Sequence, residues 1–157
     1  MNPDELLELI KTRRSYRTFE DKQINEQLGK ISRQVAHVVK GRYVSKEQPS
    51  IIDNPDIKSA LYGAPTVITL LGPKDFIFSE ADCCVACQNM MLMAHALGLG
   101  SCMISRAALT MNSDFGKALL EKKGIDTKKY RAFYHIIVGY PKGKTAIKER
   151  KSRIYKY

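Results

Sequence analysis

Apolar residues are most concentrated in the middle of the chain, over Glu80–Leu97. Nearly every helical face of this stretch carries Ala, Cys, Val, Met or Leu, which is typical of a helix buried on all sides. Ser79 and Asp82 have the form of a capping box at its start, and Gly98 can adopt the left-handed conformation that ends a helix. We predict a long, buried central helix here, followed directly by a short buried strand over residues 101–104.

A helix is also predicted at the beginning of the chain. Asn2 is its expected cap, Pro3 occupies the first helical position, and the helix is expected to end near Arg14. Its predicted buried stripe consists of Leu6, Leu7 and Ile10. Helical spacing or helix-start signals also predict three further helices, over residues 25–41, over residues 54–63, and from a cap at Asn112 or Ser113 to Lys123.

Runs of β-branched and apolar residues predict two more strands, over residues 66–71 and 131–138. Each run is followed by a glycine and a proline that break it. Helices and strands are mixed without the regular alternation of a doubly wound sheet. The predicted fold class is therefore α+β: a small mixed or antiparallel sheet of about four strands packed against several helices, in a single domain over residues 1–157.

The formal net charge of +10 indicates that the protein attracts anions. Seven basic residues fall between Lys142 and Lys156, against the single acid Glu149. Charge alone leaves a nucleic acid, a phosphorylated cofactor and simple solubility open. We expect no signal peptide, because the first eight residues already carry acids and a helix start, and no membrane span, because Asp82 and His95 interrupt the apolar run.

The four cysteines favour a reduced, cytoplasmic protein over a disulfide framework, because Cys83, Cys84 and Cys87 lie within about one helical turn. A metal centre is the alternative for these thiols. Packing in the core is favoured, since the pair Cys84 and Cys87 lies inside an apolar helix and no second pair follows at metal-ligand spacing. No metal site is predicted. The histidines are scattered, and no nucleophile elbow or phosphate-binding glycine motif is present, so no catalytic side chain is predicted either.

Three segments are candidates for binding an anionic ligand. Residues 13–17, RRSYR, place three guanidinium groups and a hydroxyl at the end of a helix, where they can converge on a phosphate or simply lie on the surface. Residues 151–153, KSR, lie in a basic tail that can equally be solvated. Residues 98–105, GLGSCMIS, contain a glycine pair that ends a helix and that also permits close approach of a flat ligand to the backbone.

The order of these segments resembles the nitroreductase family of FMN-dependent oxidoreductases. The resemblance rests on RRSYR after a first helix, GAPTVITL, the block from Ala86 to Ser105, a VGYP strand end and a terminal KSR. It implies that the phosphate, the ribityl chain and the pyrimidine edge of FMN are held by six side chains: Arg13, Arg14, Ser15, Arg17, Lys151 and Arg153. It also implies that the backbone around Met103, Ile104 and Ser105 lines the ring and offers an N–H to N5.

The resemblance also implies a homodimer with FMN at the interface, and electron transfer from NAD(P)H through flavin N5 to a nitroaromatic, a quinone or a conjugated carbonyl by a ping-pong mechanism. The family's Pro-Ser-x-x-Asn-x-Gln-Pro-Trp segment is lacking here, since residues 42–54 are short and the chain has no tryptophan. This departure motivates an alternative, a family member that binds flavin but catalyses a different reaction or none. A basic nucleic-acid-binding module is the third hypothesis, and only the net charge supports it.

Overall fold

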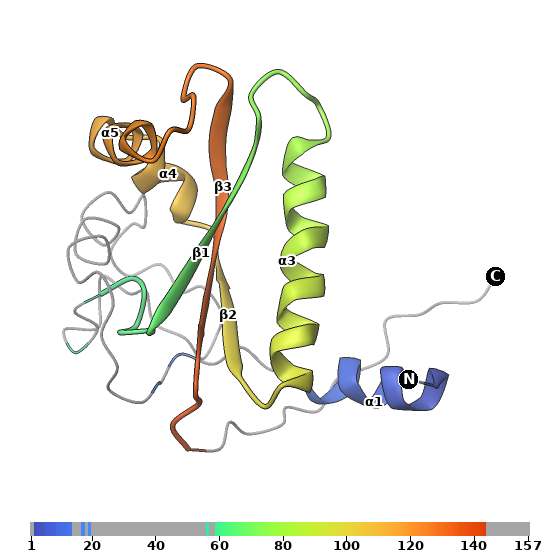
Figure 1. The fold of residues 1–157 in the computed structure, drawn as a ribbon. Coiled ribbons are helices and arrows are strands. Elements are labelled where there is room, and N and C mark those ends of the chain that lie inside the picture. The colour runs from blue at the N-terminus through green and yellow to red at the C-terminus, as the bar shows by residue number, and fades with distance from the viewer. Residues whose placement is uncertain (1, 14–16, 18, 20–55, 57–58, 144–157) are drawn as a thin grey trace, which may run out of the picture.

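The computed structural model describes residues 2–13, 17, 19, 56 and 59–143. Its helices and strands, labelled as in Figure 1, are α1 (Pro3–Thr12), β1 (Thr66–Pro73), α3 (Ser79–Ala96), β2 (Gly100–Ile104), α4 (Ala107–Met111), α5 (Asp114–Lys122) and β3 (Tyr130–Gly139). The helix predicted over residues 25–41 lies outside the described residues, as do residues 54, 55, 57 and 58 of the one predicted over 54–63. The described part of that second range, residues 56 and 59–63, contains turns and no helix, so the helix predicted there is wrong for these residues.

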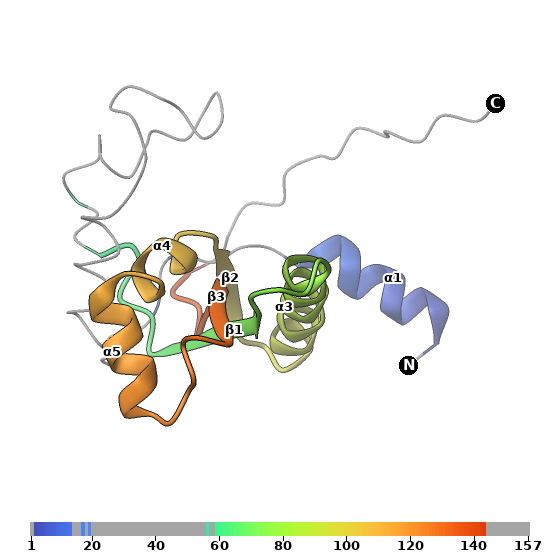
Figure 2. The same cartoon turned by 90° about the horizontal axis from the view of Figure 1, so that it is seen from above.

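The described strands form one antiparallel sheet in the order β1-β3-β2. Helix α3 covers one face of this sheet, and α4 and α5 lie on the other side, so that the sheet is the middle of three layers (Figure 2). The predicted α+β class is confirmed. The described part of the chain contains three strands rather than about four, together with an isolated bridge between Phe19 and Pro141.

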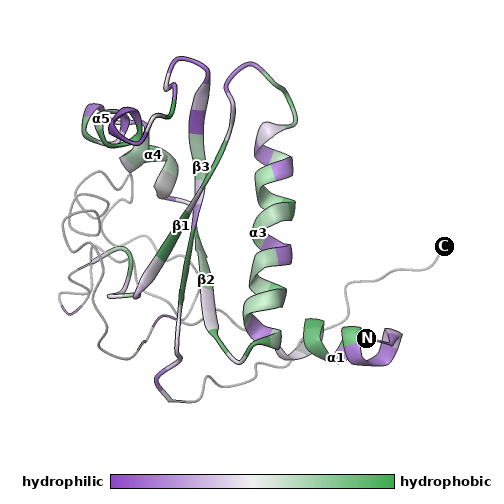
Figure 3. Ribbon diagram, in the orientation of Figure 1, coloured by the Kyte–Doolittle hydropathy of each residue, from purple (hydrophilic) through white to green (hydrophobic). Residues whose placement is uncertain are grey.

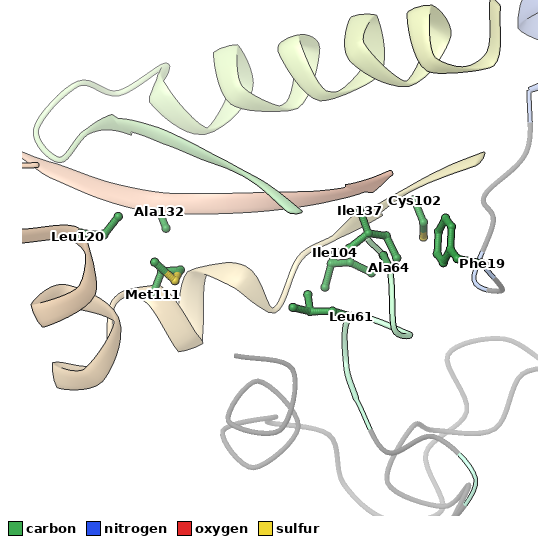
Figure 4. Packing of buried hydrophobic residues seen from close by; sticks show 9 residues of the cluster. All are labelled: Phe19, Leu61, Ala64, Cys102, Ile104, Met111, Leu120, Ala132 and Ile137. Atoms are coloured by element: carbon green, nitrogen blue, oxygen red, sulfur yellow. The ribbon is translucent and has the colours of Figure 1, made fainter. Parts of the chain in front are cut away.

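The core has two parts, one on each face of the sheet. Successive side chains of a strand point to opposite faces, so Ile136 packs in the cluster beneath α3 while Ile137 packs in the cluster on the other face. Neither side chain has any exposed surface. The second cluster joins β3 and β2 to α4, α5, Phe19 and the turn around Leu61 (Figure 4).

The start of α3 corrects one prediction and its end confirms another. Phe78 is the residue before the helix, and no side chain caps it, because the Ser79 hydroxyl donates instead to the carbonyl oxygen of Pro73 at 2.8 Å. The predicted capping box is therefore wrong. Gly98 has φ +73°, the left-handed conformation predicted for the end of the helix.

The burial of α3 differs from the prediction more strongly. Its side toward the sheet is buried, but Val85 is 62% exposed, Met93 62% and Leu97 67%. The prediction of burial on all sides is thus wrong for the single chain, because the sheet covers only one face of the helix. Hydrophobic bands nevertheless recur along α3 between hydrophilic ones (Figure 3).

Helix α1 is also more exposed than predicted. Its predicted start is confirmed, since Asn2 and Glu5 form a reciprocal capping box with distances of 2.8 and 2.9 Å. It ends at Thr12, and it extends away from the sheet beyond α3 (Figure 2). The three apolar residues predicted to form a buried stripe are each at least 40% exposed, so this prediction too is wrong for the single chain: Leu6, Leu7 and Ile10.

The remaining predicted elements agree closely with the structure. The strands β1, β2 and β3 each include the predicted range and extend it by one or two residues. Strand β1 is less buried than predicted, since only Leu70 and Gly72 are buried along it. Ser113 caps α5 by accepting a hydrogen bond from the backbone N–H of Gly116. Within the described residues, no helix is long and apolar enough to cross a membrane.

Candidate functional site

The segment that carries the predicted phosphate-binding arginines begins where α1 meets the end of α3. Thr12 Oγ1 lies 3.0 Å from His95 Nε2 and donates its own proton to the carbonyl oxygen of Glu8 at 2.7 Å. Because the hydroxyl has one proton, the His95 Nε2–H must be the donor in the contact with Thr12. This hydrogen bond fixes the start of the segment, and Arg13 follows it directly with a half-buried side chain.

The other end of the segment is held in the core. Phe19 is buried in the cluster of Figure 4 and forms a bridge with Pro141, just after β3. Gly139 permits this approach, because a Cβ atom there would lie 2.5 Å from Pro65 Cδ and 2.8 Å from Phe19 Cδ1. The basic tail starts immediately after Pro141. The bridge therefore brings the arginine segment and the start of the tail to the same end of the sheet.

The third predicted segment lies on β2. Ile104 is buried, Met103 is half-buried between β2 and α3, and Ser105 is exposed directly after the strand. Within the described sheet β2 is an edge strand, so half of its backbone N–H and C=O groups point away from β3. An edge with free backbone donors is suited to hydrogen bonding with a flat heteroaromatic ring.

Two residues that the sequence analysis did not single out join this region. Tyr62 has φ 54°, an unusual conformation for a residue with a side chain, and the guanidinium carbon of Arg17 lies 6.0 Å from the centre of its ring. Arg106 follows Ser105, and its Nη1 atom is buried with no hydrogen-bond partner among the described residues. A cation placed directly after a predicted ligand-binding strand was the signal in the sequence that could have revealed Arg106.

The electrostatics of Arg106 indicate a site for an electron-rich group. Burial lowers the pKa of Arg106, and the nearby Tyr62 hydroxyl opposes this shift; among the described residues no carboxylate contributes. A guanidinium that is partly desolvated without an acidic partner favours an acceptor from a ligand. Arg17 and Arg106 are cationic donors of this region that the structure describes, while four predicted binding residues lie outside the described residues: Arg14, Ser15, Lys151 and Arg153.

The cysteines behave as packing residues. Cys83 and Cys87 belong to the cluster beneath α3, and Cys102 belongs to the cluster on the other face, which confirms the core positions predicted for these three. Burial raises the pKa of the Cys87 thiol to about 11. Cys84 is exposed, so the core position predicted for it is wrong in the single chain, because the sheet covers only one face of α3. Nowhere in the described ranges do three His, Cys, Asp or Glu side chains lie together as a metal site would require.

Comparison with known proteins identifies the family and the fold of the chain. The model of the nitroreductase family matches residues 30–140. A nitroreductase with bound FMN from Bacteroides fragilis has 23% sequence identity and a TM-score of 0.65, and the similarity covers 98% of this chain and 96% of that one. A nitroreductase with bound FMN from Desulfitobacterium hafniense has 19% identity and a TM-score of 0.69, covering 100% of this chain and 98% of that one.

An FMN-dependent nitroreductase from Clostridium difficile has 20% identity and a TM-score of 0.66, covering 99% of this chain and 100% of that one. At these identities the similarity establishes the fold. No curated protein matches the sequence. Because the family match spans more than half of the chain and the fold agrees along its whole length, the chain belongs to the nitroreductase family.

Proposed function

We propose that this chain is a single FMN-binding domain over residues 1–157 that passes electrons from NAD(P)H to a small acceptor, such as a nitroaromatic, a quinone or a conjugated carbonyl. The observation that carries the proposal is the bridge between Phe19 and Pro141, which brings the arginine segment to the start of the basic tail. Family membership and the FMN bound by similar structures support the choice of cofactor.

The residues proposed to hold FMN fall into two groups. Cationic and hydroxyl side chains would bind the phosphate, the ribityl chain and the pyrimidine edge: Arg13, Arg14, Ser15, Arg17, Lys151 and Arg153. The backbone of Met103, Ile104 and Ser105 would line the ring. A charge-assisted hydrogen bond contributes about 1.5–3 kcal/mol, so two or three arginine contacts suffice to anchor a mononucleotide.

Bound FMN would supply the redox chemistry, accepting a hydride at N5 and releasing electrons to a second substrate in alternation. The chain's own contribution is binding and electrostatics. Arg17 would supply positive charge beside the pyrimidine edge of the bound ring, and the Ser105 backbone N–H is the proposed donor to N5. No described side chain is assigned as a proton donor.

We further propose that the protein is a homodimer with the cofactor at the interface. The described surface exposes apolar side chains on the outer face of α3 and on α1, including Val85, Met93 and Leu7. Several large exposed apolar side chains on two helices are typical of an interface, and a second copy of the chain would bury them. The free cysteines support placing the protein in the cytoplasm.

An absorption spectrum tests the proposal most directly. The protein purified with FMN should absorb near 450 nm, as oxidised flavins do, and should oxidise NADH or NADPH when a quinone is present. Arg17→Ala should weaken FMN binding by at least about tenfold, because it removes one charge-assisted contact. The exposed Lys122→Ala on α5 is the matched control. Protein that fails to take up FMN contradicts the proposal, and flavin-loaded protein without turnover supports the alternative of a flavin-binding member with another reaction.

A further inference from the structure

A second positively charged site lies at the opposite end of the sheet. A cavity of about 310 Å³ is lined by side chains from the residues that directly follow β1 and α4, from α5 and the loop after it, and from the start of β3: Lys74, Asn112, Lys117, Leu120, Thr127, Tyr130 and Arg131. Strand β3 runs from this cavity to the arginine segment near Pro141, and its ten residues span about 30 Å (Figure 1). The cavity is therefore separate from the proposed FMN site.

The three cations of the cavity come from three elements that are distant in sequence. Lys74 follows β1, Lys117 belongs to α5, and Arg131 is the second residue of β3. None of them forms an ion pair within the described part of the chain. The guanidinium of Arg131 lies over the ring of the buried Phe133, with its carbon 4.4 Å from the ring centre. This stacking fixes the plane of the guanidinium and leaves its N–H edge free for a ligand.

No carboxylate lines the cavity among the described residues, and the two acids that adjoin the lining residue Thr127 have partners of their own. Glu121 accepts a hydrogen bond from the Thr127 hydroxyl, and Asp126 pairs with Lys129 and accepts the backbone N–H of Lys128. Asn112 is also occupied, because its amide bonds to both backbone groups of Ala132 at 3.0 Å. These bonds build a wall for the cavity and leave cations and the Tyr130 hydroxyl as its available donors.

We propose that this cavity binds a small phosphorylated anion, such as a pyrophosphate or a phosphate monoester. Three like charges around one cavity repel each other, and a multivalent anion would remove the repulsion while accepting their hydrogen bonds. The volume is at the lower end of the range of small-ligand pockets, about 300–1,000 Å³, which suits an anion of this size. The proposal is independent of the FMN proposal.

The test measures thermal unfolding of the FMN-saturated protein in increasing inorganic pyrophosphate, at constant ionic strength. The wild type should show a saturable rise in Tm, as expected for a ligand that binds only the folded state. Lys117→Gln should weaken the pyrophosphate affinity by about tenfold, because it removes one charge-assisted contact. Lys122→Gln, which removes the same charge from the same helix but outside the cavity, should leave the affinity unchanged.

A second readout separates a binding role from a structural one. Without pyrophosphate, Lys117→Gln should unfold at the same temperature as the wild type or higher, because it relieves repulsion; a structural lysine would give a lower Tm. Arg17→Ala should keep the full pyrophosphate response, since Arg17 lies at the other end of the sheet. The proposal is overturned if the wild type shows no saturable rise, if Lys122→Gln loses the response to the same extent as Lys117→Gln, or if pyrophosphate acts only by displacing FMN.

Discussion

Gly139 provides the sharpest test of how the fold builds the proposed cofactor site. A Cβ atom at this position would lie 2.5 Å from Pro65 Cδ and 2.8 Å from Phe19 Cδ1, closer than real Cβ contacts. Both neighbours are rings, and Phe19 is buried in the core. In Gly139→Ala one ring must therefore move, and overpacking of this kind costs about 1–3 kcal/mol of the free energy of unfolding.

The change should also affect the cofactor, because Phe19 anchors the end of the arginine segment. Moving Phe19 displaces Arg17, two residues earlier, from its position beside Tyr62. Loss of one charge-assisted contact of about 1.5–3 kcal/mol corresponds to an FMN affinity at least about tenfold weaker. Flavin fluorescence titration measures this affinity, and urea unfolding measures the stability of the same samples.

Gly124→Ala is the matched control for this experiment. Gly124 has φ +79°, so alanine there costs about 1–2 kcal/mol through the backbone, while its Cβ meets no atom within 4 Å. The control should lose similar stability and keep its FMN affinity. Equal FMN affinities for Gly139→Ala and Gly124→Ala, at equal loss of stability, would refute the argument that Phe19 positions the arginine segment.

Three further predictions concern other parts of the chain. Val85→Glu should convert the proposed dimer to a monomer in sedimentation experiments, because it places a charge on the exposed apolar face of α3, whereas Ala118→Glu on α5 should not. Arg106→Met should stabilise the FMN-free protein, because it removes a partly desolvated cation, and should weaken FMN binding; unchanged FMN affinity would exclude Arg106 from the site. Burial lowers the pKa of His135 to about 4 from 6.5. Between these two pH values the unfolded chain therefore binds a proton at His135 that the folded chain does not bind. The free energy of unfolding that is fully present above pH 6.5 should fall by up to about 3 kcal/mol as the pH approaches 4. In His135→Gln, urea unfolding between these pH values should show a correspondingly smaller decrease, and an identical decrease would contradict the assignment.

The features predicted most accurately are those that depend on residues close together in the sequence. The caps at Asn2 and Ser113 and the left-handed end at Gly98 follow from local chemistry, and the structure contains all three. The short helix α4 was not predicted, because five residues show no helical period. The hydrogen bond of Ser79 to Pro73 was also not predictable, since it depends on the loop that returns from β1 to α3.

Burial was harder to predict, because an apolar pattern does not say what covers it. The all-round apolar surface of α3 implies contacts on every side, while its own sheet supplies only one. For a similar reason, the sequence predicted only part of the candidate site. RRSYR and GLGSCMIS are continuous motifs, but the positions of Arg106 and Tyr62 beside them depend on tertiary structure. The positions of Arg14, Ser15, Lys151 and Arg153 remain predictions, since these residues lie outside the described part of the chain.

The exposed apolar surface and the proposed cofactor site are connected through α1. This helix extends away from its own sheet (Figures 1 and 2), and the hydrogen bond between Thr12 and His95 links its end to α3. Arg13, which follows α1 directly, is therefore placed by a helix on which Leu6, Leu7 and Ile10 are each at least 40% exposed in the single chain. If a second copy covers them, association fixes α1 and with it the start of the arginine segment, so FMN should bind more tightly to the dimer than to the monomer.

Dilution should then release FMN and dissociate the dimer over the same range of protein concentration, as followed by flavin fluorescence and sedimentation. Val85→Glu should also lose FMN affinity, although Val85 is not an assigned cofactor residue. A monomeric Val85→Glu protein that binds FMN as tightly as the wild type would show that one chain builds the site alone.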